Sequence, residues 1–130
     1  MDYRKNKNTI KEFTDLLVWQ EGHKLVLEVY RLTNRFPREE RYSMVDQMRR
    51  AAVSVTSNIA EGFGRQTYKE KVQFYYLAKG SLVELRNQVL IAKDLKYFQN
   101  RQHELIIRHL DTVQKLLQGL IKSTKSLSQV

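Results

Sequence analysis

The sequence predicts an all-α fold, an antiparallel up-down four-helix bundle, as a single domain over residues 1–130. The chain contains one proline and five glycines, too few for the closely spaced turns that an all-β fold needs. Apolar residues recur at spacings of three and four positions in four long stretches joined by short links. This pattern is typical of helices that pack apolar stripes around one shared core, which a chain of this length can form.

The first helix is expected over about residues 15–35, after a flexible basic arm at residues 1–12. Thr14 is a suitable N-cap for this helix. The helix should end before the Phe36-Pro37 pair, because the residue preceding a proline is disfavoured in helical conformation. Gly22 lies inside the helix, where glycine is less favourable than alanine by about 1 kcal/mol.

The second helix is expected over about residues 43–62. Ser43 can cap its N-terminus, with Asp46 in the position from which an acidic side chain reaches back to the cap. Gly62 should end the helix, because glycine readily adopts the left-handed conformation of a C′ residue. One apolar stripe is predicted to face the core: Val45, Met48, Ala52, Val55 and Ile59.

The third and fourth helices are the longest. The third is expected over about residues 68–96, opened by a capping box of Thr67 and Glu70. Its predicted inner positions are Phe74, Leu77, Ser81, Leu82, Leu85, Gln88, Val89, Ala92 and Leu95. The fourth is expected over about residues 101–126, with Asn100 as its cap. Its predicted inner positions are Ile106, Leu110, Val113, Leu117, Leu120, Thr124 and Leu127.

Composition restricts the class of function. The net charge is +9, from 23 Lys and Arg against 14 Asp and Glu, which favours nucleic acid or an anionic membrane surface as a partner. A merely solubilising surface is the alternative. Cysteine is absent, which excludes disulfides, thiolate zinc sites and cysteine nucleophiles. The start of the sequence lacks a signal-peptide pattern and no apolar run approaches membrane-span length, so a cytoplasmic location without a membrane partner is expected.

The sequence shows no catalytic pattern. His23, His103 and His109 are the only histidines, and none has the Glu-x-x-His spacing of di-iron bundles. His103 and His109 are six positions apart and therefore point to different sides of a helix. No phosphate-binding glycine loop follows a strand, and no serine lies in a strand-to-helix elbow. We expect a protein without enzymatic activity, cofactor, metal or small-molecule substrate.

Basic residues gather towards both ends of the chain. Those near the start are Arg4, Lys5, Lys7 and Lys11, and the segment after Asp111 contains Lys115, Lys122 and Lys125 without an acidic residue. Both termini of an antiparallel four-helix bundle lie at the same end, so these residues are expected to form one nucleic-acid-binding surface. A second candidate is the elbow between the second and third helices. There Arg65, Lys69 and Lys71 lie near a helix N-terminus, which attracts anions.

Arginines and acids of the second and third helices have two interpretations. Arg49 and Arg50 could pair with Glu61 and Glu84 between helices, a type of contact that favours specificity more than stability. Alternatively the arginines contact phosphate, to which their planar fork is well suited. Arg50 is therefore a candidate nucleic-acid contact, whereas Arg49 is assigned first to a structural network.

Small and polar residues are expected where the second and third helices meet. Ser54, Asn58 and Ser81 should form a polar network, because a buried amide needs hydrogen-bond partners. Several small residues of the second helix should allow it to approach Gly80 closely. An outer aromatic face is expected on the third helix, suited to a subunit interface: Tyr68, Tyr75 and Tyr76.

A longer pattern in the middle of the chain resembles a known family. Residues 47–65 read QMRRAAVSVTSNIAEGFGR, and residues 78–85 read AKGSLVEL shortly after Phe74. Upstream stand LVWQ at residues 17–20, a tyrosine at position 30, and FPREE at residues 36–40. Over about residues 13–98 the chain resembles the four-helix-bundle proteins of 23S rRNA intervening sequences, and more distantly the accessory variability proteins of diversity-generating retroelements.

The resemblance implies a ring-like homo-oligomer, a pentamer, with a basic face for rRNA or other nucleic acid. The leading hypothesis is a non-catalytic basic bundle that binds structured RNA or acts as a nucleic-acid-associated adaptor. The alternative is a protein-interaction scaffold with no nucleic-acid ligand. Peripheral membrane attachment through the last helix is disfavoured, because the apolar stripe of that helix is needed for the core.

Overall fold

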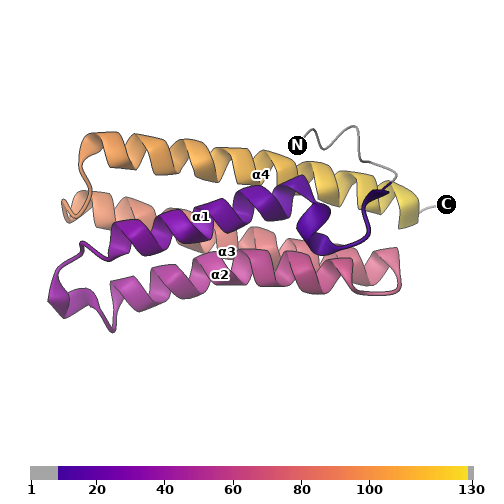
Figure 1. Cartoon of the computed structure of the whole chain (residues 1–130), viewed down its shortest axis with the longest axis horizontal. Coiled ribbons are helices and arrows are strands. Elements are labelled where there is room, and N and C mark those ends of the chain that lie inside the picture. The colour runs from indigo at the N-terminus through magenta and orange to yellow at the C-terminus, as the bar shows by residue number, and fades with distance from the viewer. Residues whose placement is uncertain (1–8, 129–130) are drawn as a thin grey trace.

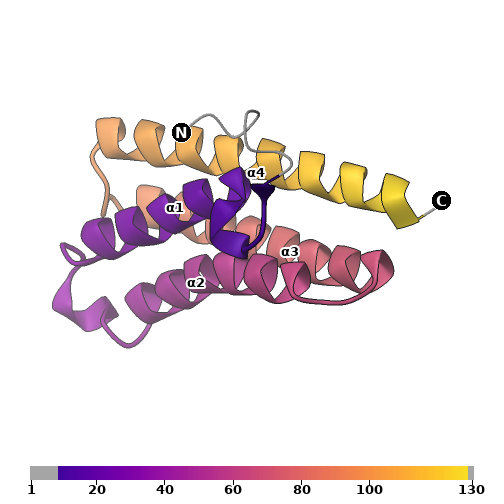
Figure 2. The same ribbon diagram turned by 45° about the vertical axis from the view of Figure 1, so that its right-hand side comes forward.

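The computed structural model describes residues 9–128, and four long helices dominate it. They are α1 (Leu17–Thr33), α2 (Met44–Phe63), α3 (Tyr68–Asp94) and α4 (Asn100–Ser128). Two short 3-10 turns precede α1 and α2, namely η2 (Phe13–Asp15) and η3 (Arg38–Glu40). Successive helices run in opposite directions along the long axis (Figures 1 and 2), and each packs against the helices before and after it, with α1 also against α4. The predicted all-α four-helix class is confirmed.

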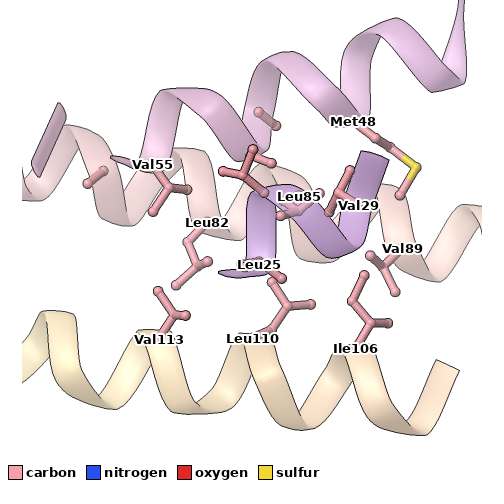
Figure 3. Packing of buried hydrophobic residues seen from close by; sticks show 14 of the residues in the cluster. Leu25, Val29, Met48, Val55, Leu82, Leu85, Val89, Ile106, Leu110 and Val113 are labelled. Carbon is pink, nitrogen blue, oxygen red and sulfur yellow. The ribbon is translucent and has the colours of Figure 1, made fainter. Parts of the chain in front are cut away.

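All four helices contribute to one apolar core (Figure 3). Leu25 and Val29 of α1 meet Met48 and Val55 of α2, and each of these four side chains is almost completely buried. The opposite half of this layer comes from α3 and α4: Leu82, Leu85, Val89, Ile106, Leu110 and Val113. Removing a side chain of this size from water contributes about 1.5–3 kcal/mol, so this layer is the main source of stability.

Two glycines allow helices to approach closely, and one of them, Gly62, differs from expectation. Gly62 was expected to end α2 in the left-handed region, but α2 continues through it to Phe63 and no described glycine has a positive φ. A Cβ on Gly62 would lie 2.7 Å from the ring of Tyr75 on α3. A Cβ on Gly22 would lie 3.1 Å from Thr56 on α2, so this glycine brings α1 close to α2. Gly80, by contrast, has no such neighbour within 4 Å.

The inner face of α3 agrees with the prediction at Leu82, Leu85, Gln88, Val89 and Ala92 but differs towards the two ends of the helix. Tyr75 is only 2% exposed, and burial raises the pKa of its phenol to about 12. It was expected on an outer aromatic face with Tyr68 and Tyr76, both of which are exposed. Leu77 and Leu95 were expected in the core but are 57% and 51% exposed. The buried positions of α3 are Tyr75, Ala78, Leu82, Leu85, Gln88, Val89 and Ala92.

The other helices follow their predicted stripes more closely. All five predicted core residues of α2 are buried, whereas Ile121 replaces Leu120 in α4 and Leu127 is exposed. Thr67 caps α3 as predicted, accepting a hydrogen bond from the Glu70 amide at 3.1 Å. Ser43 precedes α2 but makes no capping hydrogen bond with its side chain.

The start of α1 also differs from the prediction. Thr14 lies within η2 instead of capping α1, and Leu16 occupies the N-cap position without a side-chain hydrogen bond. Asp15 accepts hydrogen bonds from the backbone amides of Lys11 and Glu12, both at 3.0 Å, and these bonds lower its pKa. The carboxylate of Asp15 therefore stabilises the turn before α1.

The C-terminus of α3 ends in a Schellman motif without a glycine. Lys96 has φ 64°, and its amide donates to the Lys93 carbonyl at 2.9 Å. The Tyr97 amide donates to the Ala92 carbonyl at 2.9 Å, which completes the paired hydrogen bonds of this cap. Lysine adopts the left-handed conformation with strain, because its Cβ approaches the following carbonyl.

A half-buried pair connects α1 to α4. His109 Nδ1 lies 2.6 Å from a carboxylate oxygen of Glu28, and Nε2 lies 3.0 Å from the Glu21 carbonyl oxygen. A carbonyl and an ionised carboxylate only accept hydrogen bonds, so this arrangement favours the charged imidazolium, in which both ring nitrogens donate. The hydrogen bond that His109 donates to Glu28 raises the pKa of His109 against the opposing effect of burial.

Replacing Lys96 by glycine should stabilise the fold by about 1 kcal/mol, because the strain of a left-handed lysine disappears. Urea unfolding monitored by circular dichroism measures this change. Lys93→Gly, at a helical position three residues earlier, is the matched control and should destabilise by about 1 kcal/mol. A Lys96→Gly protein no more stable than the original would contradict the assignment.

The contact between His109 and Glu28 should make stability depend on pH. A raised pKa means that the folded state holds the proton more tightly, so the stabilisation is complete below the unfolded pKa of about 6.5. It is lost as the pH rises through the higher pKa of the folded state. The measurement is the difference in unfolding free energy between the original protein and Glu28→Gln, across pH about 5.5–8.5.

That difference should be largest at the acidic end and shrink towards the alkaline end. Comparing the two proteins cancels the contribution of His103, because both contain this residue. Burial lowers the pKa of His103, so its contribution to stability increases with pH, opposite to that of His109. A difference that stays constant over the whole pH range would rule out an ionic contact.

Candidate nucleic-acid interface

A basic groove lies between the first half of α3 and the last third of α4. We call it the α3–α4 groove; it has a volume of about 320 Å³ and is lined by Tyr76, Lys79, Gln118, Ile121, Lys122, Lys125 and Ser126. Because α3 and α4 run in opposite directions (Figure 1), the start of one helix lies beside the end of the other. The groove therefore combines residues that are more than forty positions apart in the sequence.

Helical spacing explains why these side chains converge. Tyr76 and Lys79 are three positions apart on α3, and Lys122 and Lys125 are three apart on α4, so each pair lies on one face of its helix. The Lys125 ammonium lies 3.2 Å from the Tyr76 hydroxyl and 5.8 Å from the centre of its ring. No carboxylate lies within ion-pair distance of the three lysines in the part of the chain that is described.

The predicted C-terminal lysines divide between two grooves. Lys122 and Lys125 line the α3–α4 groove, but Lys115 lines a separate and more apolar groove between α1 and α4, of about 290 Å³. The start of α1 forms the other wall of this second groove with Leu16 and Val18. A phosphate bound among Lys122 and Lys125 would not occupy the groove that Lys115 lines.

The predicted N-terminal cluster is only partly described. Arg4, Lys5 and Lys7 lie outside the described residues. Lys11 is exposed, and the chain that follows it enters α1 beside the second half of α4, because Leu16 and Val18 line one groove with Lys115 and Ser123. One surface shared by the N-terminal and C-terminal basic residues therefore stays a prediction.

The elbow between α2 and α3 holds its basic residues in contacts of its own. Arg65 pairs with Glu61 at 3.2 Å, and its guanidinium lies 4.4 Å from the centre of the Phe74 ring. The Lys71 ammonium donates to the Phe63 carbonyl, and burial lowers its pKa. Lys69 is exposed and forms no ion pair with another described residue. The elbow therefore offers less free positive charge than the α3–α4 groove.

The arginines of α2 do not form the ion pairs expected between helices. Arg50 pairs with Asp46 within α2 at 3.0 Å, and Glu61 pairs with Arg65 near the same helix end. Glu84 accepts a hydrogen bond from Gln88 at 3.3 Å within α3. Side chains four positions apart on one helix are neighbours, which explains why these residues pair within a helix and not between helices.

Arg49 makes its contacts with α1 and not with an acid. Its Nε donates to the Thr33 hydroxyl at 3.0 Å, and Nη2 donates to the Tyr30 carbonyl at 3.4 Å. Its guanidinium also lies 4.5 Å from the centre of the Tyr30 ring. These partners are all neutral, so they orient the guanidinium without cancelling its charge.

Polar side chains connect α2 to α3 beside the core. The hydroxyls of Ser54 and Ser81 are 2.8 Å apart, and Asn58 donates to the Ser54 carbonyl and hydroxyl at 2.8 and 3.1 Å. The Ser81 hydroxyl also lies 3.2 Å from the Leu77 carbonyl. Because these groups satisfy one another, they hold the two helices in register and leave little unmet hydrogen-bonding capacity for a ligand.

Sequence reasoning missed Lys79, Tyr76 and Gln118 as members of the groove. The signal that could have found them is the antiparallel register of α3 and α4, which places the first turns of one beside the last turns of the other. Arg86 marks the same register farther along, donating to Asp111 at 2.9 Å and to Gln114 at 2.8 Å. Because the two helices are antiparallel, residues before Arg86 on α3 lie beside residues after Gln114 on α4, which is where the groove is.

The described residues show neither a metal-binding cluster nor a membrane span. No three histidine or acidic side chains among residues 9–128 are close enough to hold a metal ion together. Within the same residues, no helix combines the length and apolar character needed to cross a bilayer. The chemistry available in the α3–α4 groove is the binding of anions by ammonium groups beside an aromatic ring.

A solved structure with a similar fold comes from Bacteroides thetaiotaomicron. It is a protein with unknown function from the S23 ribosomal protein family, 19% identical to this chain, with a TM-score of 0.73. The match covers 82% of this chain and 99% of that one. A search of curated proteins found no match.

The sequence pattern extends over most of the bundle. Residues 14–119 match the family described as 23S rRNA-intervening sequence protein, from η2 into the second half of α4. This range includes the QMRRAAVSVTSNIAEGFGR segment of α2 and the Lys79 side of the α3–α4 groove. The chain therefore belongs to the 23S rRNA-intervening sequence protein family.

Proposed function

We propose that this protein is a non-catalytic, oligomeric bundle that binds structured RNA through the phosphate backbone, with the α3–α4 groove as its principal contact. The observation that carries the proposal is the convergence of Lys79, Lys122 and Lys125 around Tyr76. The family description, which names 23S rRNA, and the net charge of +9 support the same class of partner. An adaptor that acts on RNA together with other proteins is included in this proposal.

The groove has the properties that a phosphate backbone requires. Lysine ammonium groups are point charges on flexible stems, so they can follow phosphates without a fixed geometry. Tyr76 is partly exposed and offers a ring face on which a base could stack. Gln118 and Ser126 add neutral hydrogen-bonding groups at the edge. This combination suits binding without strict sequence readout, because phosphate contacts carry no base information.

The described histidines have positions that do not favour general acid–base catalysis. Both ring nitrogens of His109 are occupied by Glu28 and the Glu21 carbonyl. His23 stacks on Trp19 with ring centres 4.8 Å apart. None of the three histidines lines the α3–α4 groove. A binding role for the groove needs none of them, which is why the proposal is non-catalytic.

Self-association is proposed through the outer face of α3. Leu77, Ile91 and the C-cap residue Leu95 are each at least 40% exposed and recur at spacings of fourteen and four, so they share one side of α3. Exposed large apolar side chains along one side of a helix are candidates for a surface that another molecule covers. The proposed occupant is a second copy of the chain, arranged in a ring-like homo-oligomer such as a pentamer.

The double variant Lys122→Gln/Lys125→Gln should bind structured RNA less tightly. Its binding should also depend less on salt, with a slope of log affinity against log salt smaller by about two, one for each lost phosphate contact. Filter binding to an rRNA fragment across about 50–300 mM salt measures both quantities.

Lys79→Gln should weaken binding in the same manner. Lys93→Gln is the matched control, because it removes one exposed charge from the far end of α3. Equal losses for Lys79→Gln and Lys93→Gln would mean that net charge, not the groove, determines binding. If the original protein no longer binds RNA at physiological salt, the result would favour a scaffold without a nucleic-acid ligand.

Leu77→Glu/Ile91→Glu should reduce the native mass of the protein while leaving its helical content unchanged. Both side chains are exposed in the single chain, so a charge there costs little unless another subunit covers them. Analytical ultracentrifugation gives the mass, and Leu105→Glu, equally exposed on α4, is the control. A mass that is the same for the double variant and the original would place the subunit contact elsewhere.

The alternative function is a protein-interaction scaffold with no nucleic-acid ligand. The same exposed apolar side chains favour this alternative, because a different protein could cover them instead of a second copy of the chain. The two possibilities predict opposite results in the salt titration described above. A scaffold would bind RNA only at low salt and without a preference among the lysine variants.

A further inference from the structure

A second basic cavity lies at the opposite end of the bundle from the end of α4. We call it the arginine pocket; it has a volume of about 350 Å³, and Arg38, Arg41 and Arg49 line it together with Asn34, Phe36 and Pro37. The connection between α1 and α2 forms its outer wall, at the left end of the bundle in Figure 1. The pocket shares no lining residue with the α3–α4 groove.

Arg49 is held in a fixed orientation at this pocket. The Thr33 hydroxyl donates to the Val29 carbonyl at 2.7 Å, so its oxygen is left to accept the 3.0 Å hydrogen bond from Arg49 Nε. Tyr30 supports the guanidinium through its ring and its carbonyl. These contacts use Nε and Nη2, and no hydrogen bond from Nη1 is formed within the described residues. A guanidinium fixed in advance loses little entropy when it binds an anion.

The positive charge of the pocket is not neutralised by neighbouring acids. Across residues 9–128, no carboxylate lies within ion-pair distance of Arg38, Arg41 or Arg49. Asp46 pairs with Arg50 at 3.0 Å, and Glu39 and Glu40, which lie between Arg38 and Arg41 in the sequence, form no ion pair with them. Three arginines in one cavity without a counter-ion repel one another, and an anion would relieve that repulsion.

The apolar wall of the pocket is rigid. Phe36 is buried and packs against Tyr97 and Phe98, with ring centres 5.1 and 5.3 Å apart, so the connection between α1 and α2 is tied to the connection between α3 and α4. Pro37 follows with a fixed φ. The arginines therefore project from a firmly packed support and not from a loose loop.

The geometry points to the arginine pocket as a binding site for a phosphate monoester group, a compact oxyanion with nearly two negative charges at neutral pH. Guanidinium groups bind phosphate oxygens with paired hydrogen bonds, and Arg49 and the two exposed arginines can approach one phosphate from different sides. Inorganic phosphate and the 5′-phosphate of an RNA chain both supply this chemistry. The inference goes beyond RNA-backbone binding, because it concerns a separate site with a different charge requirement.

The test is calorimetric titration of the full-length protein with inorganic phosphate at constant ionic strength. Saturable binding is expected, weakened about tenfold by Arg41→Gln and by Arg38→Gln, because each change removes one charge-assisted contact. Both residues are exposed, so these variants should fold normally, whereas Arg49→Lys tests the requirement for a planar fork. Arg35→Gln is the matched control, since it removes the same charge from the same connection outside the pocket and should leave affinity within about twofold.

Two further comparisons identify the source of the phosphate. RNA oligonucleotides with a 5′-monophosphate should bind more tightly than the same sequence with a 5′-hydroxyl if the RNA end is the ligand, and equally if free phosphate is. Lys122→Gln/Lys125→Gln should leave phosphate affinity unchanged, so the failure of RNA-backbone binding and the failure of this site are separate results. The inference is overturned if phosphate shows no saturable binding up to about 10 mM, or if Arg35→Gln weakens it as much as Arg41→Gln does.

Discussion

The burial of Tyr75 beneath Gly62 determines how α3 is rotated in the bundle, and much of the surface follows from that rotation. A Cβ at position 62 would lie 2.7 Å from the Tyr75 ring, so α2 can cover this large side chain only because it has a glycine there. With Tyr75 inside, Ala78, Leu82 and Leu85 follow at helical spacing into the core. Tyr76 and Lys79 are then directed towards α4 and line the α3–α4 groove, while Leu77 is turned outwards.

The two basic sites at opposite ends of the bundle use different kinds of positive charge. The α3–α4 groove presents three lysines beside a tyrosine, an arrangement suited to several phosphates along a flexible chain. The arginine pocket presents guanidinium groups, one of them fixed by Thr33 and Tyr30, an arrangement suited to one compact phosphate. Elsewhere on the bundle, Asp46, Glu61 and Asp111 are each paired with an arginine. The net charge of +9 is thus distributed unevenly over the surface.

Prediction from sequence was most accurate where one side of a helix is apolar and the rest is polar. All five predicted core residues of α2 are buried, because only one face of that helix could enter the core. In α3, apolar residues occur around most of the helix, so the spacing pattern alone does not select a face, and Leu77 and Leu95 were wrongly placed inside. The left-handed Lys96 was also missed, since the usual sequence signal for this conformation is a glycine. Lys122 and Lys125 were recognised as basic, but their partner Lys79 lies on another helix.

The sequence by itself determined the class of fold, the approximate position of each helix, the family and the excess of positive charge. These depend on properties that are local in the chain: apolar spacing, the scarcity of proline and glycine, and composition. The tertiary structure decided which face of α3 is buried, which lysines share a groove, and that Arg49 contacts Thr33 and Tyr30 instead of an acid. Those outcomes depend on the rotation and register of one helix against another, which close packing at positions such as Gly62 sets and which spacing within a single helix does not encode.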